Sequence, residues 1–203
     1  NLKMIKKADI LNCKDIALMD TSADGNNLEL YCYQNCSNDS SALVKQSRGI
    51  VFQDNKLIFQ GYHYTEEYSP DQLKELNEIS KNLKQYKIFH SEEGTLIRLF
   101  HHNKIWYIST NKKLNAFNSR WSAKHSFGEI FVNSLFNLYT YQNGYLNALG
   151  KEETRETILK SFMNSLDTSK SYMILLRSNR YTRIVCKETK GAEIFHVGSV
   201  VKG

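Results

Sequence analysis

Two short segments of the sequence carry side chains suited to holding a phosphate group. Arg48 stands just before Gly49, which opens an apolar run, and an arginine there can bind a phosphate through two parallel hydrogen bonds. Lys112 and Lys113 follow a second apolar run and offer amines to a phosphate or to a nucleic-acid backbone. The alternative for each is an ordinary solvated cation at the end of a strand. We take all three as candidate phosphate-binding residues.

A third group of residues suits single-stranded nucleic acid. Arg120 and Lys124 extend the basic stretch around Trp121, and bases stack on aromatic side chains while cations follow the backbone. The chain of 203 residues has a formal net charge of +6 and a pI near 9.0, which favours a polyanionic partner. RNA or another nucleic acid is therefore the expected ligand, and a basic protein without such a partner is the alternative.

The order of three motifs resembles the nucleotidyltransferase domain of the T-even phage RNA ligase family. That family has Arg-Gly-Ile-x-Phe, then Lys-x-Asp-Gly-Ser-Leu, then a strand ending in Ser-Lys-Gly-Ser. The corresponding segments here are Ser47–Phe52, Phe89–Arg98 and Ile108–Leu114. The resemblance covers roughly residues 28–200. It implies an α+β fold, with antiparallel sheets and flanking helices, of the ATP-dependent ligase adenylation type.

The resemblance also implies roles for particular residues. It marks six positions as nucleotide- or phosphate-binding: Arg48, Glu93, Gly94, Arg98, Lys112 and Lys113. It places Ser91 where the family has its reactive lysine. A lysine with a lowered pKa attacks the α-phosphate and forms a phosphoramidate, which a serine cannot form. His90 would face the other side of a strand and cannot activate Ser91. No catalytic residue is therefore assigned in this register.

Two further positions depart from the family pattern. Glu66 and Glu67 stand in the segment where the family carries a lysine, and carboxylates there would repel a triphosphate. The stretch Tyr172–Val185 resembles a family segment, but the glutamate that contacts the ribose, expected near Leu176, is absent. The family's later Glu-Gly and Lys-x-Lys motifs would fall beyond Gly203.

A different register remains open. Lys45 could be the reactive lysine, with Glu93 and Gly94 as the later Glu-Gly motif and with Lys112 and Lys113 near the last motif. The 48 residues between Lys45 and Glu93 leave little room for the intervening strands.

These observations predict a nucleotidyltransferase-like domain that no longer forms a covalent intermediate. It would bind nucleic acid or a nucleotide, or act as a scaffold in a larger protein or a viral particle. One alternative is an active ATP-dependent RNA ligase, with ATP and Mg²⁺ as cofactors and its chemistry completed elsewhere or by Lys45. Another is a purely structural assembly protein whose aromatic surfaces make protein contacts. For the degenerate domain no cofactor is expected.

Histidine and cysteine spacing predicts no metal site. Among the four cysteines only Cys32 and Cys36 are close in sequence, and no second pair completes a zinc motif. The pair His101-His102 falls at an expected hairpin turn, which favours solvent exposure. Reduced thiols and the absence of a membrane-length apolar run predict a cytoplasmic location, either in a host cell or in a virion, and no membrane partner.

Local patterns predict the elements that must position these residues. Helices are expected in residues 1–20 with Asp9 as a cap, in Asp71–Tyr86 with Ser69 and Pro70 at its start, and in Ser126–Tyr141 and Glu152–Leu166. The expected strands are Leu28–Tyr33, Gly49–Phe52, Lys56–Gln60, Thr95–His101, Lys104–Ser109, Tyr172–Leu176, Tyr181–Lys187 and Ala192–Val201. Without a βαβ rhythm, pairing should be mainly antiparallel.

The chain reads as a single domain, residues 1–203. It begins at Asn1 and stops abruptly at Gly203, so we expect a fragment of a longer protein whose remainder would be a partner. The richness in Asn, Lys, Tyr and Ile suggests an AT-rich genome, such as that of a large DNA virus or a phage.

Overall fold

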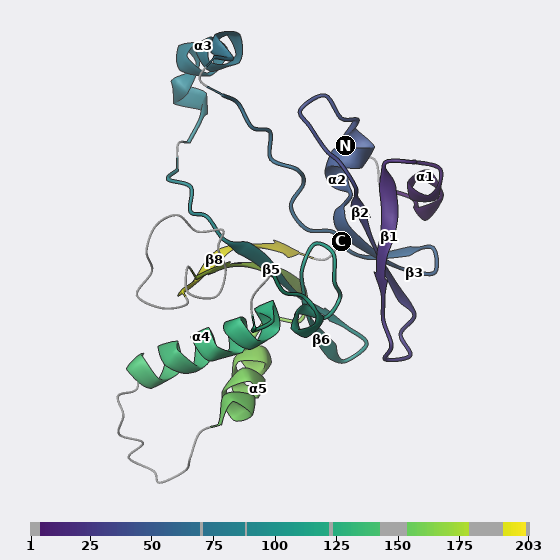
Figure 1. Ribbon diagram of the computed structural model, residues 1–203, viewed down its shortest axis with the longest axis vertical. Helices are drawn as coiled ribbons and strands as arrows, with labels where there is room; N and C mark the ends of the chain where they lie inside the picture. Colours follow the sequence, from purple (N-terminus) through teal and green to yellow (C-terminus); the bar gives the residue numbers. More distant parts are fainter. Residues whose placement is uncertain are drawn as a thin grey trace.

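Two four-stranded antiparallel sheets form the framework of the protein. The computed structural model describes residues 5–69, 71–87, 89–121, 124–142, 154–178 and 193–201. The strand orders are β1-β2-β3-β4 in the first sheet and β6-β5-β7-β8 in the second (Figure 1). All six strand pairs are antiparallel, so the predicted α+β class with antiparallel pairing is confirmed.

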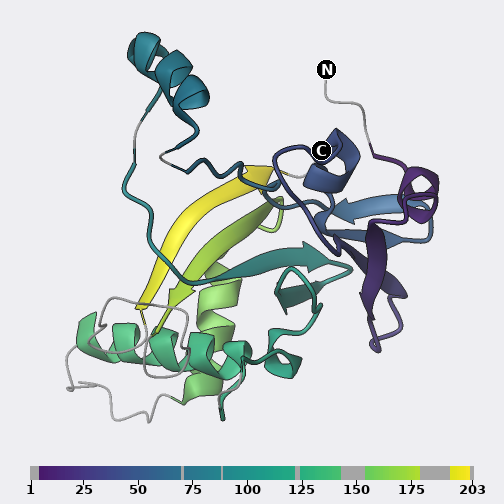
Figure 2. The same cartoon turned by 45° about the horizontal axis from the view of Figure 1, so that its top comes forward.

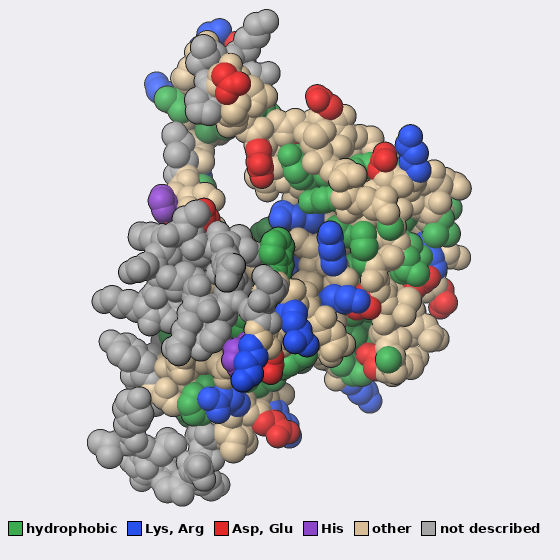
Figure 3. Space-filling view, viewed as in Figure 1, with side chains coloured by type: hydrophobic (Ala, Val, Ile, Leu, Met, Phe, Trp, Pro, Cys, Tyr) green, Lys and Arg blue, Asp and Glu red, His purple; other side chains and the backbone are tan. Residues whose placement is uncertain are grey.

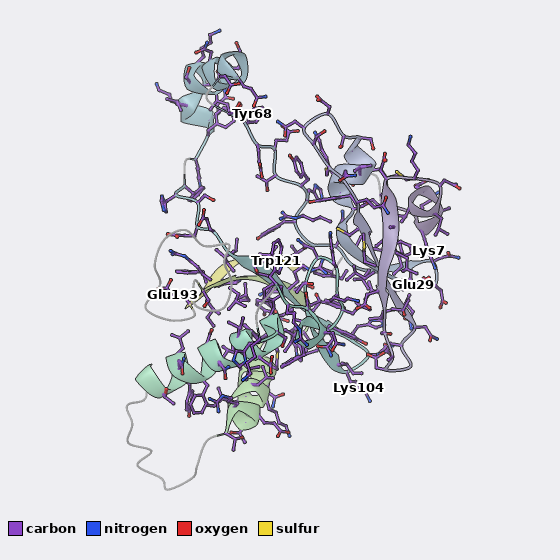
Figure 4. All side chains as sticks on the ribbon, in the orientation of Figure 1. Lys7, Glu29, Tyr68, Lys104, Trp121 and Glu193 are labelled. Carbon is purple, nitrogen blue, oxygen red and sulfur yellow. The ribbon has the colours of Figure 1, made fainter. Side chains whose placement is uncertain are left out.

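The first sheet comes from the N-terminal part of the chain. Its strands are β1 (Ile16–Thr21), β2 (Leu28–Tyr33), β3 (Arg48–Gln53) and β4 (Lys56–Phe59). The short helices α1 (Lys7–Leu11) and α2 (Ala42–Gln46) cover one face through a core that includes Tyr31, Val44 and Phe52. Lys7 and Glu29 form an ion pair that ties α1 to β2 (Figure 4).

The second sheet carries two helices on one face. Its strands are β5 (Thr95–His102), β6 (Ile105–Ser109), β7 (Lys170–Arg177) and β8 (Glu193–Val201). The helices α4 (Phe127–Gln142) and α5 (Arg155–Ser165) pack beneath the curved sheet (Figure 2). The Ser126 hydroxyl accepts from the Glu129 amide, and the Glu129 carboxylate accepts from the Ser126 amide, which caps α4. The 3₁₀ helix η2 (Ala116–Asn118) precedes α4.

Residues 61–93 connect the two sheets and are called the arm below. They contain α3 (Leu73–Lys81) and the 3₁₀ helix η1 (Leu83–Gln85), and α3 projects away from both sheets (Figures 1 and 2). At the start of the arm, the Tyr62 hydroxyl lies so close to Gly198 of β8 that a side chain there would collide with it. The arm therefore crosses the edge of the second sheet before it leaves the body of the protein.

The sheets meet through a stack of aromatic rings. Phe100 of β5 lies between Phe59 of β4 and Tyr107 of β6, with ring centroids 4.8 Å apart on both sides. This cluster also contains Leu30 and Met173, all buried. Because residues from both sheets share this core, the start of β3 and the end of β6 are held next to each other.

Most expected elements are present, and several details are corrected. The structure adds β1, α2 and η2, which the sequence patterns did not predict. Asp9 lies inside the first turn of α1, and the residue that precedes the helix is Lys6. Gln72, and not Ser69, stands at the start of α3.

His101 and His102 belong to β5 and are half-buried, so the expected exposed turn is wrong. Pro70 and the expected strand Tyr181–Lys187 lie outside the described residues.

Among the described residues, none of the helices combines the length and the apolar character that crossing a membrane requires.

Candidate anion site at the seam of the two sheets

Arg98 joins the two sheets at the place where they meet. Its side chain is 0% exposed, and one Nη atom donates to the carbonyls of Gly49 at 2.5 Å and of Arg48 at 3.2 Å. The other Nη donates to the carbonyl of Thr110, just after β6. The guanidinium also lies 5.0 Å from the ring centroid of Phe59. The Arg98 side chain is thus enclosed where the start of β3 meets the end of β6, and a phosphate-binding role for it stays a prediction.

Arg98 is a cation without an anionic partner in the described part of the chain. Its bonds go to neutral carbonyls, no carboxylate pairs with it there, and its buried Nε has no hydrogen-bond partner. Burial lowers the pKa of Arg98 to about 9. The guanidinium therefore still carries its charge at neutral pH and raises the electrostatic potential of its surroundings.

Arg48 adds a second charge beside it. Arg48 opens β3 and is half-buried, and one Nη lies 3.4 Å from the carbonyl of His63 in the arm. Its Nε is also buried and has no partner among the described residues. Two guanidinium groups at one junction thus retain an unused donor each. An arginine Nε and one of its Nη atoms together form the edge that binds a carboxylate or phosphate.

Gly49 allows this close approach. Its φ is +74°, and a Cβ at this position would collide with the Arg98 guanidinium and lie 2.8 Å from the carbonyl oxygen of Asn111. The Asn111 Oδ1 is buried and has no partner among the described residues. We call Arg48, Gly49, Arg98, Asn111 and Lys112 the seam.

Lys112 and Lys113 have different surroundings. Lys112 is exposed, and its amine makes no ion pair in the described structure. Together with Arg48 and Arg98 it acts electrostatically on the thiol of Cys32, whose pKa burial nonetheless raises. Lys113 instead lies 3.4 Å from the carboxylate of Asp20 in β1. Of the two predicted lysines, only Lys112 is left to hold a ligand at the seam.

The segment around Ser91 is occupied by ion pairs. Ser91 is exposed at the end of the arm, and the next residue, Glu92, pairs with Arg177 of β7 at 2.6 Å. Arg177 is buried and lies 3.6 Å from Glu193, the first residue of β8 (Figure 4). The arginine thus follows Leu176, where the resemblance predicts a ribose-binding glutamate. His90 lies 3.4 Å from Glu92 and not beside Ser91.

Glu93 and Gly94 lie where β5 begins. Glu93 is exposed, and Gly94 is a close-contact position because a Cβ there would come 2.5 Å from the carbonyl oxygen of Leu176. The glycine of the predicted motif is therefore required by the packing of β5 against β7. A binding role for Glu93 and Gly94 stays a prediction.

Lys45, the nucleophile of the second register, is held in an ion pair. It lies in the last turn of α2, and its amine is 2.6 Å from the Glu66 carboxylate of the arm. The hydrogen bonds from Lys45 and from Tyr68 lower the pKa of Glu66. A paired ammonium is a poor nucleophile, because its lone pair is protonated.

Arg120, Trp121 and Lys124 lie on the surface. Both cations are exposed, and Trp121 is 56% exposed. Lys and Arg side chains gather over the middle of the face drawn in Figure 3, and Trp121 lies in that region in the same orientation (Figure 4). Arg120 and His125 also lower the pKa of Glu129, after the larger effect of its hydrogen bonds with Ser126.

The structure thus brings together only part of the predicted site. Arg48, Arg98 and Lys112 meet at the seam. Lys45 is instead held in an ion pair with Glu66 of the arm and Lys113 in one with Asp20 of β1, while Ser91 is exposed next to Glu92, which pairs with Arg177. Sequence reasoning missed Arg177 and Glu92, because each pairs with a residue far away along the chain, and Asn111, because it lies next to Gly49, 62 positions earlier in the sequence. No group of His, Cys, Asp and Glu that could hold a metal ion is present in the residues that the structure describes.

Comparison with known proteins gives a viral relationship. The chain is 32% identical over 168 residues, 82% of its length, to the immediate-early protein ICP-46 homolog of Invertebrate iridescent virus 6. It is 28% identical over 162 residues to the homolog of Invertebrate iridescent virus 3 and 29% identical over 154 residues to the immediate-early protein ICP-46 of Frog virus 3. The chain spans about a third of the length of these relatives, 33% to 36%.

Homology to the iridovirus immediate-early protein ICP-46 therefore covers most of the chain, and the expectation of a viral relationship is confirmed. No family model and no solved structure matches the chain. The resemblance to RNA ligases and the specific nucleotidyltransferase fold stay predictions.

Proposed function

We propose that the protein is a nucleotidyltransferase-like module that binds nucleic-acid phosphate at the seam without forming a covalent nucleotidyl intermediate. The observation that carries this proposal is the pair of buried Nε atoms of Arg48 and Arg98, which have no partner among the described residues. Buried donors are rarely left unpaired in native proteins, and an unpaired one is costly. A bound anion would satisfy both.

The charge at the seam supports an anion over a neutral ligand. Arg98 is fully buried without a carboxylate in the described structure, and Arg48 and Lys112 add two further cations nearby. A buried cation without a counterion is destabilised, and an incoming phosphate relieves that cost. Lys112 remains exposed at the edge of the seam, where the ligand would enter.

The exposed residues Arg120, Trp121 and Lys124 extend the surface beyond one phosphate. Trp121 offers an aromatic face, and the flanking cations offer contacts to the backbone of a single strand. This combination supports RNA or another single-stranded nucleic acid as the ligand, with the seam holding one of its phosphates.

The serine at position 91 and the ion pair of Lys45 support the absence of covalent chemistry. Ser91 cannot form a phosphoramidate, and the Lys45 amine is paired with Glu66. No glutamate stands near Leu176, where the resemblance expects one to bind ribose, and the residue after Leu176 is Arg177. Incubation with labelled ATP or GTP and Mg²⁺ followed by a denaturing gel tests this part. We expect no labelled protein band. A band that disappears in Lys45→Ala would overturn the proposal in favour of an active ligase.

Binding of a single-stranded oligouridylate, followed by fluorescence anisotropy, tests the seam. Arg48→Gln should weaken binding, because it removes the positive charge and the Nε–Nη edge of one guanidinium and keeps a polar side chain. Each lost charged contact is expected to cost about tenfold in affinity. Lys104→Gln is the matched control, since it removes one positive charge at the tip of the β5–β6 hairpin (Figure 4). Equal affinity of Arg48→Gln and Lys104→Gln would contradict the proposed site.

One observation favours a role in assembly as a second candidate. The arm exposes large apolar side chains, with Phe89 at 79%, Tyr86 at 51% and Leu83 at 49%. Isolated exposed apolar residues are normal, but several on one projecting segment are typical of contact surfaces. Binding of oligouridylate that is undetectable or does not depend on salt would favour this candidate, since phosphate contacts always weaken with salt.

A further inference from the structure

A second cavity lies away from the seam, between the two edge strands β1 and β6. Its volume is about 540 Å³, within the range of small-ligand and peptide sites. One wall is formed by Asp20 to Asp24 at the end of β1 and the turn after it, another by Ile105 to Ile108 of β6, and the third by residues around η2. We call this cavity the acidic pocket.

The wall made by β6 is an open sheet edge. β6 is the outermost strand of the second sheet and pairs only with β5 in the described structure. In an antiparallel strand, alternate residues direct their backbone N–H and C=O groups away from the paired neighbour. Such groups along Ile105–Ile108 therefore form a row available to an added strand.

The charge of the pocket is opposite to that of the whole chain. Its lining contains Asp20 and Asp24 and no Lys or Arg, although the chain carries a net charge of +6. Burial raises the pKa of Asp24, but hydrogen bonds from Tyr107, Asn26 and Ser22 outweigh it and leave the pKa below its ordinary value. Asp24 is thus ionised at neutral pH, which disfavours a phosphate-bearing ligand in this pocket.

Both carboxylates retain room for another donor. Asp20 accepts from the Leu114 amide at 2.8 Å and lies 3.4 Å from the Lys113 amine, and a carboxylate offers about four acceptor positions. Apolar surface stands next to these acids, with Ile105 39% exposed and Phe117 38% exposed. A guanidinium fits this combination, because it donates to carboxylates and stacks on aromatic faces.

We propose that the acidic pocket binds a short extended segment of a partner protein, which adds as a strand to β6 and places an arginine or lysine side chain between Asp20 and Asp24. Main-chain hydrogen bonds to β6 supply affinity, and the acidic and aromatic walls select a basic side chain. This site is separate from the phosphate-binding seam and does not depend on the function proposed there.

The test uses the capped peptide acetyl-Val-Thr-Arg-Thr-Val-amide as the probe, with binding followed by NMR shifts of backbone amides in the whole chain. We expect saturable shifts at Ile105–Ile108 and in the turn Ser22–Asp24. The same peptide with citrulline in place of arginine should bind about tenfold more weakly, because it lacks the charge. A peptide N-methylated along one backbone edge should give no saturable shift.

Three variants distinguish binding in the acidic pocket from a general attraction between the peptide and surface carboxylates. Asp24→Asn should reduce the affinity for the arginine peptide to that of the citrulline peptide, and Thr21→Arg should block the pocket from an exposed position in its wall. Asp54→Asn, which removes a carboxylate from the β3–β4 turn, should leave binding unchanged. The unperturbed amide spectrum of each variant verifies its fold.

Three outcomes would overturn the proposal: no saturable shift with the arginine peptide, equal affinity for the citrulline peptide, or saturable shifts at Ile105–Ile108 caused by oligouridylate. None of them bears on binding at the seam, since that site is measured with the nucleic acid and with Arg48→Gln.

Discussion

The seam and the acidic pocket both include residues of the loop that follows β6. They differ in charge and in how many of their polar groups have hydrogen-bond partners. Lys112 of this loop belongs to the seam, whereas Leu114 and Phe117 line the pocket. At the seam, cations are enclosed and donors are left over. In the pocket, carboxylates are partly exposed and mostly satisfied. The seam thus has buried donors that are unpaired among the described residues, whereas the carboxylates of the pocket already accept hydrogen bonds.

The same contrast appears in the two glycines with positive φ in these regions. Gly49 at the seam has φ +74° and is surrounded, while Gly25 beside the pocket has φ +80° and nothing within 4 Å of an added Cβ. Both glycines have a left-handed backbone that strains any other residue to a similar extent. A difference in stability between alanine variants at the two positions therefore measures packing alone.

The largest expected effect is therefore that of Gly49→Ala. Left-handed backbone costs a non-glycine residue about 1–2 kcal/mol, and the collision with Arg98 adds a packing penalty, for a total of about 4 kcal/mol. Gly25→Ala should cost only about 1–2 kcal/mol. Urea unfolding of both variants measures the difference, and equal losses would show that the seam is not tightly packed.

The second largest effect is expected from Arg98→Met, which should lower the free energy of unfolding by about 3 kcal/mol. The change leaves the buried carbonyls of Arg48, Gly49 and Thr110 without their donor. Arg120→Met, at an exposed arginine, should stay within about 0.5 kcal/mol of the wild type. If Arg98→Met unfolded at the wild-type urea concentration, the guanidinium would be dispensable for joining the sheets.

A smaller effect is expected from Tyr107, which links the aromatic core to the pocket. Burial, followed by the hydrogen bond to Asp24, raises the pKa of Tyr107 from 10.0 to about 12. A raised pKa contributes stability that is complete below pH 10.0 and is lost as the pH rises toward about 12. Tyr107→Phe should therefore lose less stability than the wild type across this interval, measured by urea unfolding at several pH values. Parallel pH curves for the two proteins would contradict the assignment.

The smallest effects distinguish the two adjacent lysines. Lys112→Ala should lower the salt dependence of oligouridylate binding by about one unit of slope, because one phosphate contact is lost. Lys113→Ala should leave the slope unchanged and cost at most about 1 kcal/mol of stability, since its partly exposed ion pair with Asp20 is a surface contact. An unaltered slope in Lys112→Ala would remove this lysine from the site.

Local patterns predicted much of the fold. The hairpin of β5 and β6 and the capped helix α4 follow from alternation, turn residues and a capping pair within a few positions of one another. The strand β1 was missed because its burial alternates poorly, with Leu18 49% exposed. The five-residue helix α2 is too short for a periodic pattern.

The sequence predicted which residue types the candidate site contains, but not how those residues are arranged in space. The sequence by itself determined which cations are present, that position 91 is a serine and cannot form a phosphoramidate, and that the chain has a net charge of +6. Only the tertiary structure decided that Arg98 is buried and bonded to the carbonyl of Arg48, 50 residues away along the chain, and that Glu92 is paired with Arg177. Charge and local propensity depend on residue type and near neighbours, whereas burial and pairing depend on which distant segments the two sheets bring into contact.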